Sequence, residues 1–282
     1  MQKFKEASMK FIFLLCALIS IAAVILICIF LFANGLPAIK KIGLWEFLGG
    51  MKWSPTKGFF GIFPMIIGSI YVTAGAIIIG VPIGVFCAVF MAKFCPKRIY
   101  RILKPAVDLL AGIPSIVYGF FGLMVIVPII QNIFGGSGKG VLTASAVLGI
   151  MILPTIINVS ETAIRAVPEN YYEGALALGA THERSVYKAT LPAAKSGITA
   201  GVILGIGRAI GEAMAVKIIA GNQAVIPKSL LSGVRTLTSN IVLEMGYATD
   251  LHREALIATA VVLFVFILII NLMFSLLKRK EK

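Results

Sequence analysis

Six long apolar runs constrain this chain more than any other feature of its sequence. A helix needs roughly 20 apolar residues to cross the hydrocarbon core of a bilayer, and each run reaches that length. We therefore predict six membrane-spanning segments joined by polar loops. The predicted spans are Phe11–Ala33, Phe63–Met91, Pro105–Ile130, Val141–Arg165, Gly197–Gly221 and Ala255–Leu277.

The runs predict helices and not the strands of a membrane barrel. In lipid, backbone N–H and C=O groups find partners only within a helix or a closed barrel, and barrel strands alternate apolar and polar residues with a period of two. The runs lack that alternation. Charged residues make up only 13% of the chain, against roughly 25% in soluble domains. The predicted fold class is an all-α membrane protein.

The basic residues are distributed unevenly between the predicted loops. The formal net charge of +14 would suggest nucleic-acid binding in a soluble chain. Here Lys and Arg concentrate in both termini, in residues 93–104 and in residues 165–195, whereas the other loops carry fewer. Under the positive-inside rule, this bias places both termini in the cytoplasm. The charge therefore reports topology and contact with membrane lipids, and it argues against a nucleic-acid partner.

The first apolar run is predicted to be an uncleaved anchor, because it is about twice as long as the core of a signal peptide, roughly 7–15 residues. Residues 1–62 then form an N-terminal transmembrane anchor with its outer loop. Residues 63–282 form a five-helix core, with a cytoplasmic loop at residues 166–196. The cysteines show neither disulfide nor metal-ligand spacing, so we expect no metal site.

The polar loop between the fourth and fifth spans has the sequence pattern of two short helices. Pro168 suits the start of the first helix, and Gly179 suits its end because glycine adopts the left-handed backbone that terminates helices. Thr181 is a suitable N-cap for the second helix. Pro192 is expected to stop that helix before the fifth span. The loop is therefore predicted to be a helix–turn–helix.

Small residues along the first of these helices permit two roles for the loop. Gly174, Ala175 and Gly179 keep the helix surface low enough to lie in a groove of a partner. Glu173 and Arg184 would then fix the register by charge. The same periodicity is typical of an amphipathic helix lying on the inner leaflet. Helical spacing alone leaves both interpretations open.

Two charged residues, Arg208 and Glu212, interrupt the predicted fifth span. They stand four residues apart, so a continuous helix would present both on one face. Arg208 lies about 11 residues from Gly197, or about 16 Å, which is close to the bilayer midplane. An unpaired charge at that depth costs at least about 2.5–3.5 kcal/mol, so the two residues are expected to neutralise each other in part.

This charged pair also permits two roles. It holds helices together within the bundle, or it lines a transport path. In a transport path, the guanidinium of Arg208 would bind a tetrahedral oxyanion through two parallel hydrogen bonds. The nearby carboxylate of Glu212 would keep that binding weak enough for rapid passage.

Three other features receive structural interpretations. Gly135–Gly140 is glycine-rich but lacks the spacing of a phosphate-binding loop, so we expect the chain to bind no ATP. Asn222–Glu254 is too polar to span and is expected to form a surface helix over residues 230–245. Asp108 and Glu161 lie near the inner ends of their spans and are expected to act as anchors there. Their expected partners are Arg101, Lys104 and Arg165.

The polar loop resembles a known family. Glu173-Gly174-Ala175, then Gly179 after three residues, then Ala189-Thr190-Leu191-Pro192 after nine more, is similar to the EAA loop of ABC importer permeases. Gly174 and Ala189 stand where that motif usually has Ala and Ile. The resemblance implies a type I, MetI-like importer permease whose loop docks on a separate ATPase. The implied ATPase contacts are Glu173, Gly174, Ala175, Gly179, Leu191 and Pro192.

Further segments narrow the resemblance to the PstC family of phosphate permease subunits. They are Trp53-Ser54-Pro55, Leu109–Phe120, Gly207–Glu212 and Asn240–Ala248. This resemblance implies a phosphate transport subunit in a prokaryotic cell membrane, with Arg208 and Glu212 on the substrate path. The implied subunit is not an enzyme and holds no cofactor. Its implied partners are a PstA-like permease, a PstB-like ATPase dimer that binds the ATP, and a PstS-like phosphate-binding protein.

Three alternatives stay open. A permease for another oxyanion, such as sulfate or molybdate, would have the same architecture. An ion-coupled secondary transporter would use Arg208, Glu212 and Glu161 as a relay without any ATPase. An inert membrane scaffold would tolerate the loss of Arg208 without any loss of transport.

Overall fold

The computed structural model describes residues 2–280 and the side chains of residues 9–273. The described chain is almost entirely helical. Its helices are α1 (Gln2–Ile42), α2 (Leu44–Gly49), α3 (Phe63–Val89), α4 (Lys97–Gly112), α5 (Ser115–Phe121), α6 (Val127–Phe134), α7 (Val141–Arg165), α8 (Glu169–Ala177), α9 (His182–Ser185), α10 (Leu191–Gly211), α11 (Met214–Ile219), α12 (Leu237–Glu244) and α13 (Asp250–Lys280).

Short elements complete the fold. An antiparallel hairpin consists of β1 (Trp53–Ser54) and β2 (Phe59–Phe60) around the 3-10 turn η1 (Pro55–Lys57). Three π-helical turns continue helices α3, α5 and α9. They are η2 (Phe90–Phe94), η3 (Gly122–Ile126) and η4 (Val186–Thr190).

Six helical segments of the described chain are long and apolar enough to cross a membrane, which confirms the predicted number of spans. The first, second, fourth and sixth agree with the prediction, apart from their ends. The third and fifth are displaced along the sequence. The six segments are Met9–Ile42, Phe63–Phe94, Ser115–Phe134, Val141–Arg165, His182–Gly211 and Asp250–Met273.

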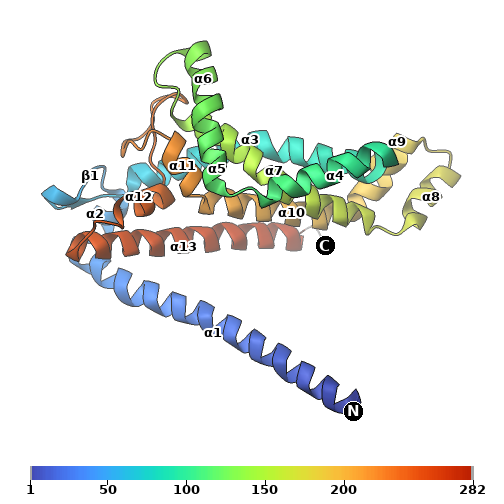
Figure 1. Cartoon of the computed structure of the whole chain (residues 1–282), viewed down its shortest axis with the longest axis horizontal. Coiled ribbons are helices and arrows are strands. Elements are labelled where there is room, and N and C mark those ends of the chain that lie inside the picture. Colours follow the sequence, from blue (N-terminus) through green and yellow to red (C-terminus); the bar gives the residue numbers. More distant parts are fainter. Residues whose placement is uncertain (1, 281–282) are drawn as a thin grey trace.

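The third span begins later than predicted because the chain breaks before it. Helix α4 ends at Gly112, Ile113 is extended (φ −69°, ψ 127°), and α5 starts after Pro114. Proline disfavours helical backbone in the residue before it, which explains the break. Residues 105–112, predicted as part of the span, belong instead to the amphipathic helix α4, which packs against α7. Figure 1 shows α5 and α6 turned away from the direction of α4.

The fifth span is displaced toward the N-terminal side of its predicted position. A continuous helical segment runs from His182 through η4 to Gly211, and Glu212 then adopts an extended backbone (ψ 125°). The residues after it form the separate short helix α11. The prediction of one helix over Gly197–Gly221 is therefore wrong. Partners elsewhere in the protein satisfy the backbone groups at this break, and an apolar sequence does not reveal them.

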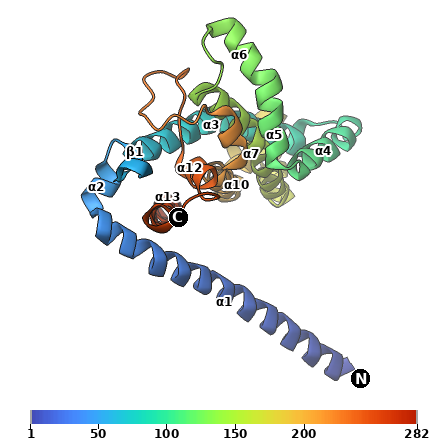
Figure 2. The ribbon, with the colours of Figure 1, turned by 60° about the vertical axis from the view of Figure 1, so that its left-hand side comes forward.

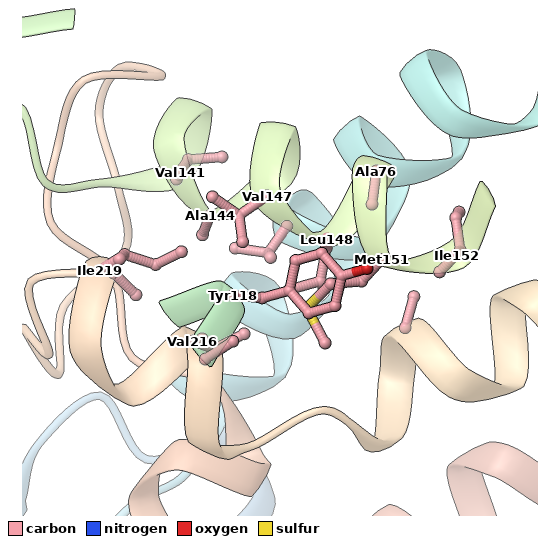
Figure 3. Close-up of a cluster of buried hydrophobic side chains, with 14 of the residues drawn as sticks. Ala76, Tyr118, Val141, Ala144, Val147, Leu148, Met151, Ile152, Val216 and Ile219 are labelled. Carbon is pink, nitrogen blue, oxygen red and sulfur yellow. The ribbon is translucent and has the colours of Figure 1, made fainter. Parts of the chain in front are cut away.

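Helix α7 is the centre of the bundle. It packs along both α3 and α10, and α5 and α11 close one end of the packed layer. The largest hydrophobic cluster lies where these helices meet, and Figure 3 shows Tyr118 among the side chains of α7 and α11 in that cluster. Small residues allow the close approach, since Gly80 of α3 faces Ile152 and Gly205 of α10 faces Ile156.

Helix α1 diverges from the bundle over most of its length. Only its C-terminal end packs on α13, where Ala38 is fully buried and the rings of Phe32 and Phe264 meet edge-on with centroids 6.1 Å apart. The rest of α1 separates from the other spans in both views (Figures 1 and 2), and most of its apolar side chains are exposed. Lipid or another chain must therefore cover this helix.

The predicted outer segments pack together. The hairpin, α2, α12 and the ends of α3 and α13 form a second hydrophobic cluster, in which Phe47, Ile62 and Leu237 are fully buried. The surface helix expected over residues 230–245 is wrong in extent and in burial. A capping box of Thr236 and Ser239 starts α12 at Leu237, and the segment before it pairs with the end of α11 through the Gly221–Val234 bridge.

The cytoplasmic placement of both termini stays a prediction, and so does the division into an anchor of residues 1–62 and a core of residues 63–282. Several terminal basic residues that support the topology lie outside the described side chains. They are Lys3, Lys5, Lys278, Arg279, Lys280 and Lys282.

The substitution Gly197→Ala tests the packing of α10 against α7. A methyl group on Gly197 would overlap the Cβ of Ala163, whereas one on Gly207 would meet no atom within 4 Å. We expect Gly197→Ala to lower the free energy of unfolding by about 1–3 kcal/mol in a denaturant titration in detergent. The control Gly207→Ala should leave it unchanged or raise it, because alanine is the better helix former. Equal effects of both substitutions would contradict close packing at Gly197.

Candidate functional site

The first half of the polar loop (residues 166–196) folds as predicted, apart from the residue at which its helix begins. Helix α8 starts at Glu169, with Pro168 as its N-cap and not, as predicted, its first residue, and Gly179 follows its end with a left-handed backbone (φ +84°). The Ala180 N–H donates to the Ala175 carbonyl at 3.1 Å, which satisfies an acceptor at the end of the helix. The chain thus makes a sharp turn at the glycine that the motif supplies.

The second half of the loop confirms one prediction and corrects another. Thr181 caps α9, because its Oγ1 accepts from the Arg184 N–H at 3.3 Å. Pro192 does not end the helix but lies in the first turn of α10, which continues α9 through η4. In a regular α-helix, the proline ring clashes with the carbonyl four residues earlier, and the wider π turn accommodates the ring. The second helix therefore runs on into the fifth span.

One face of the polar loop is open. The side chain of Leu178 is 91% exposed, and a Cβ added at Gly174 or Gly179 would have no neighbour within 4 Å. A groove of about 390 Å³ lies beside these residues. A low helix surface next to a groove gives a helix-binding partner a place to dock. The groove lining includes Ala175, Gly179, Arg184 and Lys188.

The structure divides the implied ATPase contacts into two groups. The group on α8 and its turn consists of Glu173, Gly174, Ala175 and Gly179, and these residues are exposed or half-buried. The other two begin α10. Leu191 packs against the hydrophobic cluster that joins α3, α7 and η4, and Pro192 is exposed in the first turn. The first group therefore offers a surface, and Leu191 holds that surface to the bundle.

A cluster of rings joins the polar loop to the end of α3. The Tyr172 hydroxyl and His182 Nδ1 are hydrogen-bonded at 2.7 Å. Phe94 of η2 packs edge-on against the His182 ring, with centroids 4.9 Å apart. The Lys93 ammonium lies over the Tyr172 ring at 5.4 Å and is 3.7 Å from Glu169. Sequence reasoning missed this cluster because no spacing rule connects residue 94 with residue 182.

Arg208 lies in the last turn of α10, in the middle of the bundle. Its Nη1 donates to Thr155 Oγ1 at 3.3 Å. Thr155 is about 10 residues, or about 15 Å, from the end of α7 at Arg165. Arg208 therefore lies beside the middle part of α7, and its position near the midplane stays a prediction. The predicted pairing with Glu212 is wrong, because the helix ends at Gly211 and the two side chains bind different partners.

Glu212 satisfies the backbone at the helix break. Its Oε1 accepts from the N–H of Ala215, in the first turn of α11, at 3.1 Å. Its carbonyl accepts from Thr238 Oγ1 at 2.8 Å. A carboxylate is well suited to the free N–H groups at the start of a helix. The break is therefore a stable part of the fold.

The break before the third span and the break after the fifth span lie close together. Helix α5, which follows the first break, packs on α11, which follows the second. Gly119 allows this approach, because a Cβ there would lie 2.9 Å from the Cα of Ala215. Tyr118 is buried, and its hydroxyl donates to the Leu110 carbonyl at 2.8 Å across the first break. Broken helices that meet inside a membrane bundle are typical of transporter substrate sites.

Glu161 is buried (2% exposed) and bound on both oxygens. It accepts from Arg165 Nε at 2.8 Å and from Lys104 Nζ at 3.2 Å, and Lys104 also lies 3.6 Å from Asp108. These contacts confirm Lys104 and Arg165 as the expected partners. The hydrogen bond of Tyr100 to this carboxylate raises the pKa of the Tyr100 phenol. With both oxygens engaged, Glu161 is an anchor and not a free proton carrier.

A second buried carboxylate, Glu244, was missed by sequence reasoning. It accepts from Trp53 Nε1 at 2.8 Å and from Arg235 Nη1 at 2.6 Å, and it lies 2.9 Å from His252 Nε2. These contacts join the hairpin, the start of α13 and the segment before α12. Trp53 and Glu244 both belong to segments that carry the family resemblance, but their separation in sequence gives no sign that they touch.

Residues 80–282 match the family described as binding-protein-dependent transport system inner membrane component. The matched residues include the whole polar loop and both helix breaks. All residues implied to contact the ATPase or the substrate therefore lie inside the match.

Relatives resemble the chain over most of its length. The probable ABC transporter permease protein YqgH of Bacillus subtilis is 40% identical over 271 residues, which cover 92% of this chain and 88% of the relative. The phosphate transport system permease protein PstC of Mesorhizobium japonicum is 35% identical over 265 residues, which cover 86% and 81%. These relatives confirm the resemblance to the PstC family.

Solved structures confirm the fold class. A chain of the inward-facing MetNI methionine ABC transporter superposes with a TM-score of 0.66 at 19% identity, covering 82% of this chain and 100% of that one. A chain of a bacterial alginate ABC transporter, solved with an alginate pentasaccharide-bound periplasmic protein, superposes with a TM-score of 0.64 at 14% identity and covers 94% of each chain. The architecture is therefore that of importer permeases of the MetI-like type.

The substitution Tyr172→Phe tests the connection between the polar loop and α3. It removes the hydroxyl that bonds to His182 and keeps the ring. We expect amide hydrogen exchange in α8 and α9 to become about 2- to 10-fold faster, since such a bond contributes roughly 0.5–1.5 kcal/mol. The control is Tyr171→Phe, at an exposed neighbouring side chain. Exchange rates that are the same in both variants would contradict a stabilising role of the bond.

Proposed function

Because the chain belongs to the family of binding-protein-dependent transport system inner membrane components, we propose that it is the permease subunit through which an ABC importer carries inorganic phosphate. Membership of this family makes the chain a multi-pass subunit of an ABC importer in the cell membrane. What we propose beyond this is that the transported substrate is phosphate. The observation that carries it is the position of Arg208, which is bonded to the central helix α7 one turn before the break at Glu212. Relatives named as phosphate transport permeases support the same cargo.

The chemistry of Arg208 suits an oxyanion. Its hydrogen bond goes to the neutral hydroxyl of Thr155, so this contact leaves the positive charge of the guanidinium uncompensated. A guanidinium at low dielectric attracts an anion strongly and can donate two parallel hydrogen bonds to one phosphate. The carboxylate of Glu212 accepts from the N–H of Ala215, so its negative charge lies at the start of α11 and not on Arg208. This arrangement favours entry of phosphate with binding weak enough for release.

The polar loop supports docking of an ATPase. We propose that its open face around Gly174 and Gly179 binds one subunit of a PstB-like ATPase dimer, which holds the ATP. A PstA-like permease would complete the path and, with lipid, cover the exposed length of α1. A PstS-like protein would deliver phosphate on the outer side. In this scheme, ATP binding opens the path outward and hydrolysis returns it to the inward state.

The substitution Arg208→Ala tests the cargo site. We expect phosphate uptake to fall about 10- to 100-fold in proteoliposomes that hold the assembled importer, because a hydrogen bond to a charged group contributes roughly 1.5–3 kcal/mol. Lys139→Ala, in the predicted outer turn, is the control. Unchanged uptake by a correctly assembled Arg208→Ala importer would favour a scaffold role. Wild-type vesicles that take up sulfate or molybdate faster than phosphate would favour those anions.

The substitution Gly179→Trp tests the docking face. An indole ring at the turn would occupy the groove beside Leu178, so we expect the ATPase to co-purify at about one-tenth of its wild-type yield while membrane insertion is unchanged. Glu173→Lys should act in the same direction through charge. Recovery of the ATPase at the wild-type level with both variants would contradict docking at this face.

Replacing the ATP-binding lysine of the partner ATPase separates an ABC importer from an ion-coupled transporter. The proposed importer loses uptake completely when ATP no longer binds. Uptake that persists under this change and depends on an ion gradient would favour a relay through Arg208, Glu212 and Glu161.

A further inference from the structure

A basic cavity that the proposed transport path does not use lies at the predicted cytoplasmic end of the bundle. Its volume is about 570 Å³, and η2, α4 and the end of α7 form its walls. Every charged side chain that lines it is a cation, and the phenol of Tyr100 lies among them. The cations are Lys93, Lys97, Arg101, Lys104 and Arg165.

The cations on the inner walls have acidic partners. Lys104 and Arg165 both bind the buried carboxylate of Glu161, at 3.2 Å and 2.8 Å. Lys93 lies 3.7 Å from the exposed carboxylate of Glu169. These contacts compensate much of the inner positive charge and fix where it lies.

Lys97 and Arg101 give the cavity its excess charge. Both are exposed, and neither forms an ion pair within the described part of the chain. They stand four residues apart on α4, on a face that Lys104 extends, so their like charges repel each other. An anion bound between them would replace this repulsion with attraction to both.

The walls of the cavity are held in place by contacts within the protein. The Arg165 guanidinium lies over the Tyr100 ring at 4.6 Å and donates from Nη2 to the Met91 carbonyl at 2.8 Å. Asn158 accepts from Lys104 at 2.8 Å. Because these side chains are already ordered, binding a ligand would cost less conformational entropy.

We propose that this cavity binds a phosphoryl group at the inner surface of the membrane. A phosphoryl group carries negative charge and several acceptor oxygens, which match ammonium and guanidinium groups converging from three elements. The cavity lies at the ends of α3 and α7, the level at which lipid headgroups lie, and dissolved phosphate also reaches it from the cytoplasm. Anionic lipid and inorganic phosphate offer the same group. Neither Arg208 nor Thr155 lines the cavity, so the proposal stands whether or not Arg208 binds the cargo.

Native mass spectrometry of the full chain in detergent tests the lipid source. The probes are phosphatidylglycerol, which is anionic, and phosphatidylcholine, which has no net charge. We expect phosphatidylglycerol to bind preferentially and the double variant Lys97→Gln, Arg101→Gln to weaken its binding about 10- to 30-fold. The matched control is Arg98→Gln, because Arg98 is exposed on the same helix and does not line the cavity.

Equilibrium binding of radiolabelled inorganic phosphate to the same variants tests the soluble source. These measurements use an Arg208→Gln background, so that the proposed transport path does not contribute. Binding of either probe that falls in the double variant and not with Arg98→Gln supports the site and identifies its source. Absence of binding by both probes overturns the proposal. An equal loss with Arg98→Gln also overturns it, since a diffuse basic surface would then be responsible.

Discussion

Every backbone N–H and C=O group inside the hydrocarbon must find a partner in the protein, and this requirement decides where the helices of this chain can stop. The Leu110 carbonyl, at the end of α4, accepts from the Tyr118 hydroxyl. The Ala215 N–H, at the start of α11, donates to the Glu212 carboxylate. The Glu212 carbonyl in turn accepts from Thr238, on α12. The bundle can hold two helix breaks, one before the third span and one after the fifth, because neighbouring elements complete their hydrogen bonds.

Helix α7 contacts both the surroundings of Arg208 and the basic cavity. Three polar residues of α7 stand three residues apart along the helix. Each accepts a hydrogen bond from a lysine or arginine side chain. Thr155 accepts from Arg208, Asn158 from Lys104, and Glu161 from Lys104 and Arg165 nearer the C-terminal end of α7. Most of the apolar stretch of α7 is buried, and of these acceptors Glu161 is buried whereas Thr155 and Asn158 are half-buried. One helix thus fixes both the proposed path and the basic cavity.

The sequence predicted the features that depend on local chemistry. Apolar length identified the spans, and the left-handed backbone of Gly179 and the cap at Thr181 followed from residue type. Features that depend on distant partners were not predictable in the same way. The break at Glu212 and the burial of Glu244 need side chains from other elements. The apolar residues on both sides of Glu212 even predicted a continuous helix through that position.

The helical segment from His182 to Gly211 has a mechanical consequence. It is about 45 Å long and joins the polar loop to Arg208 as one helical segment, with a π-helical turn at Val186–Thr190 and Pro192 just after it. The glycines at 197, 201 and 205 let α10 approach α7 closely, so the two helices are packed against each other along that seam. A rod of this length is a lever, and a tilt of about 5° at one end displaces the other by about 4 Å. A small rotation of the polar loop would therefore move the Arg208 end of the helix by more than the length of a hydrogen bond.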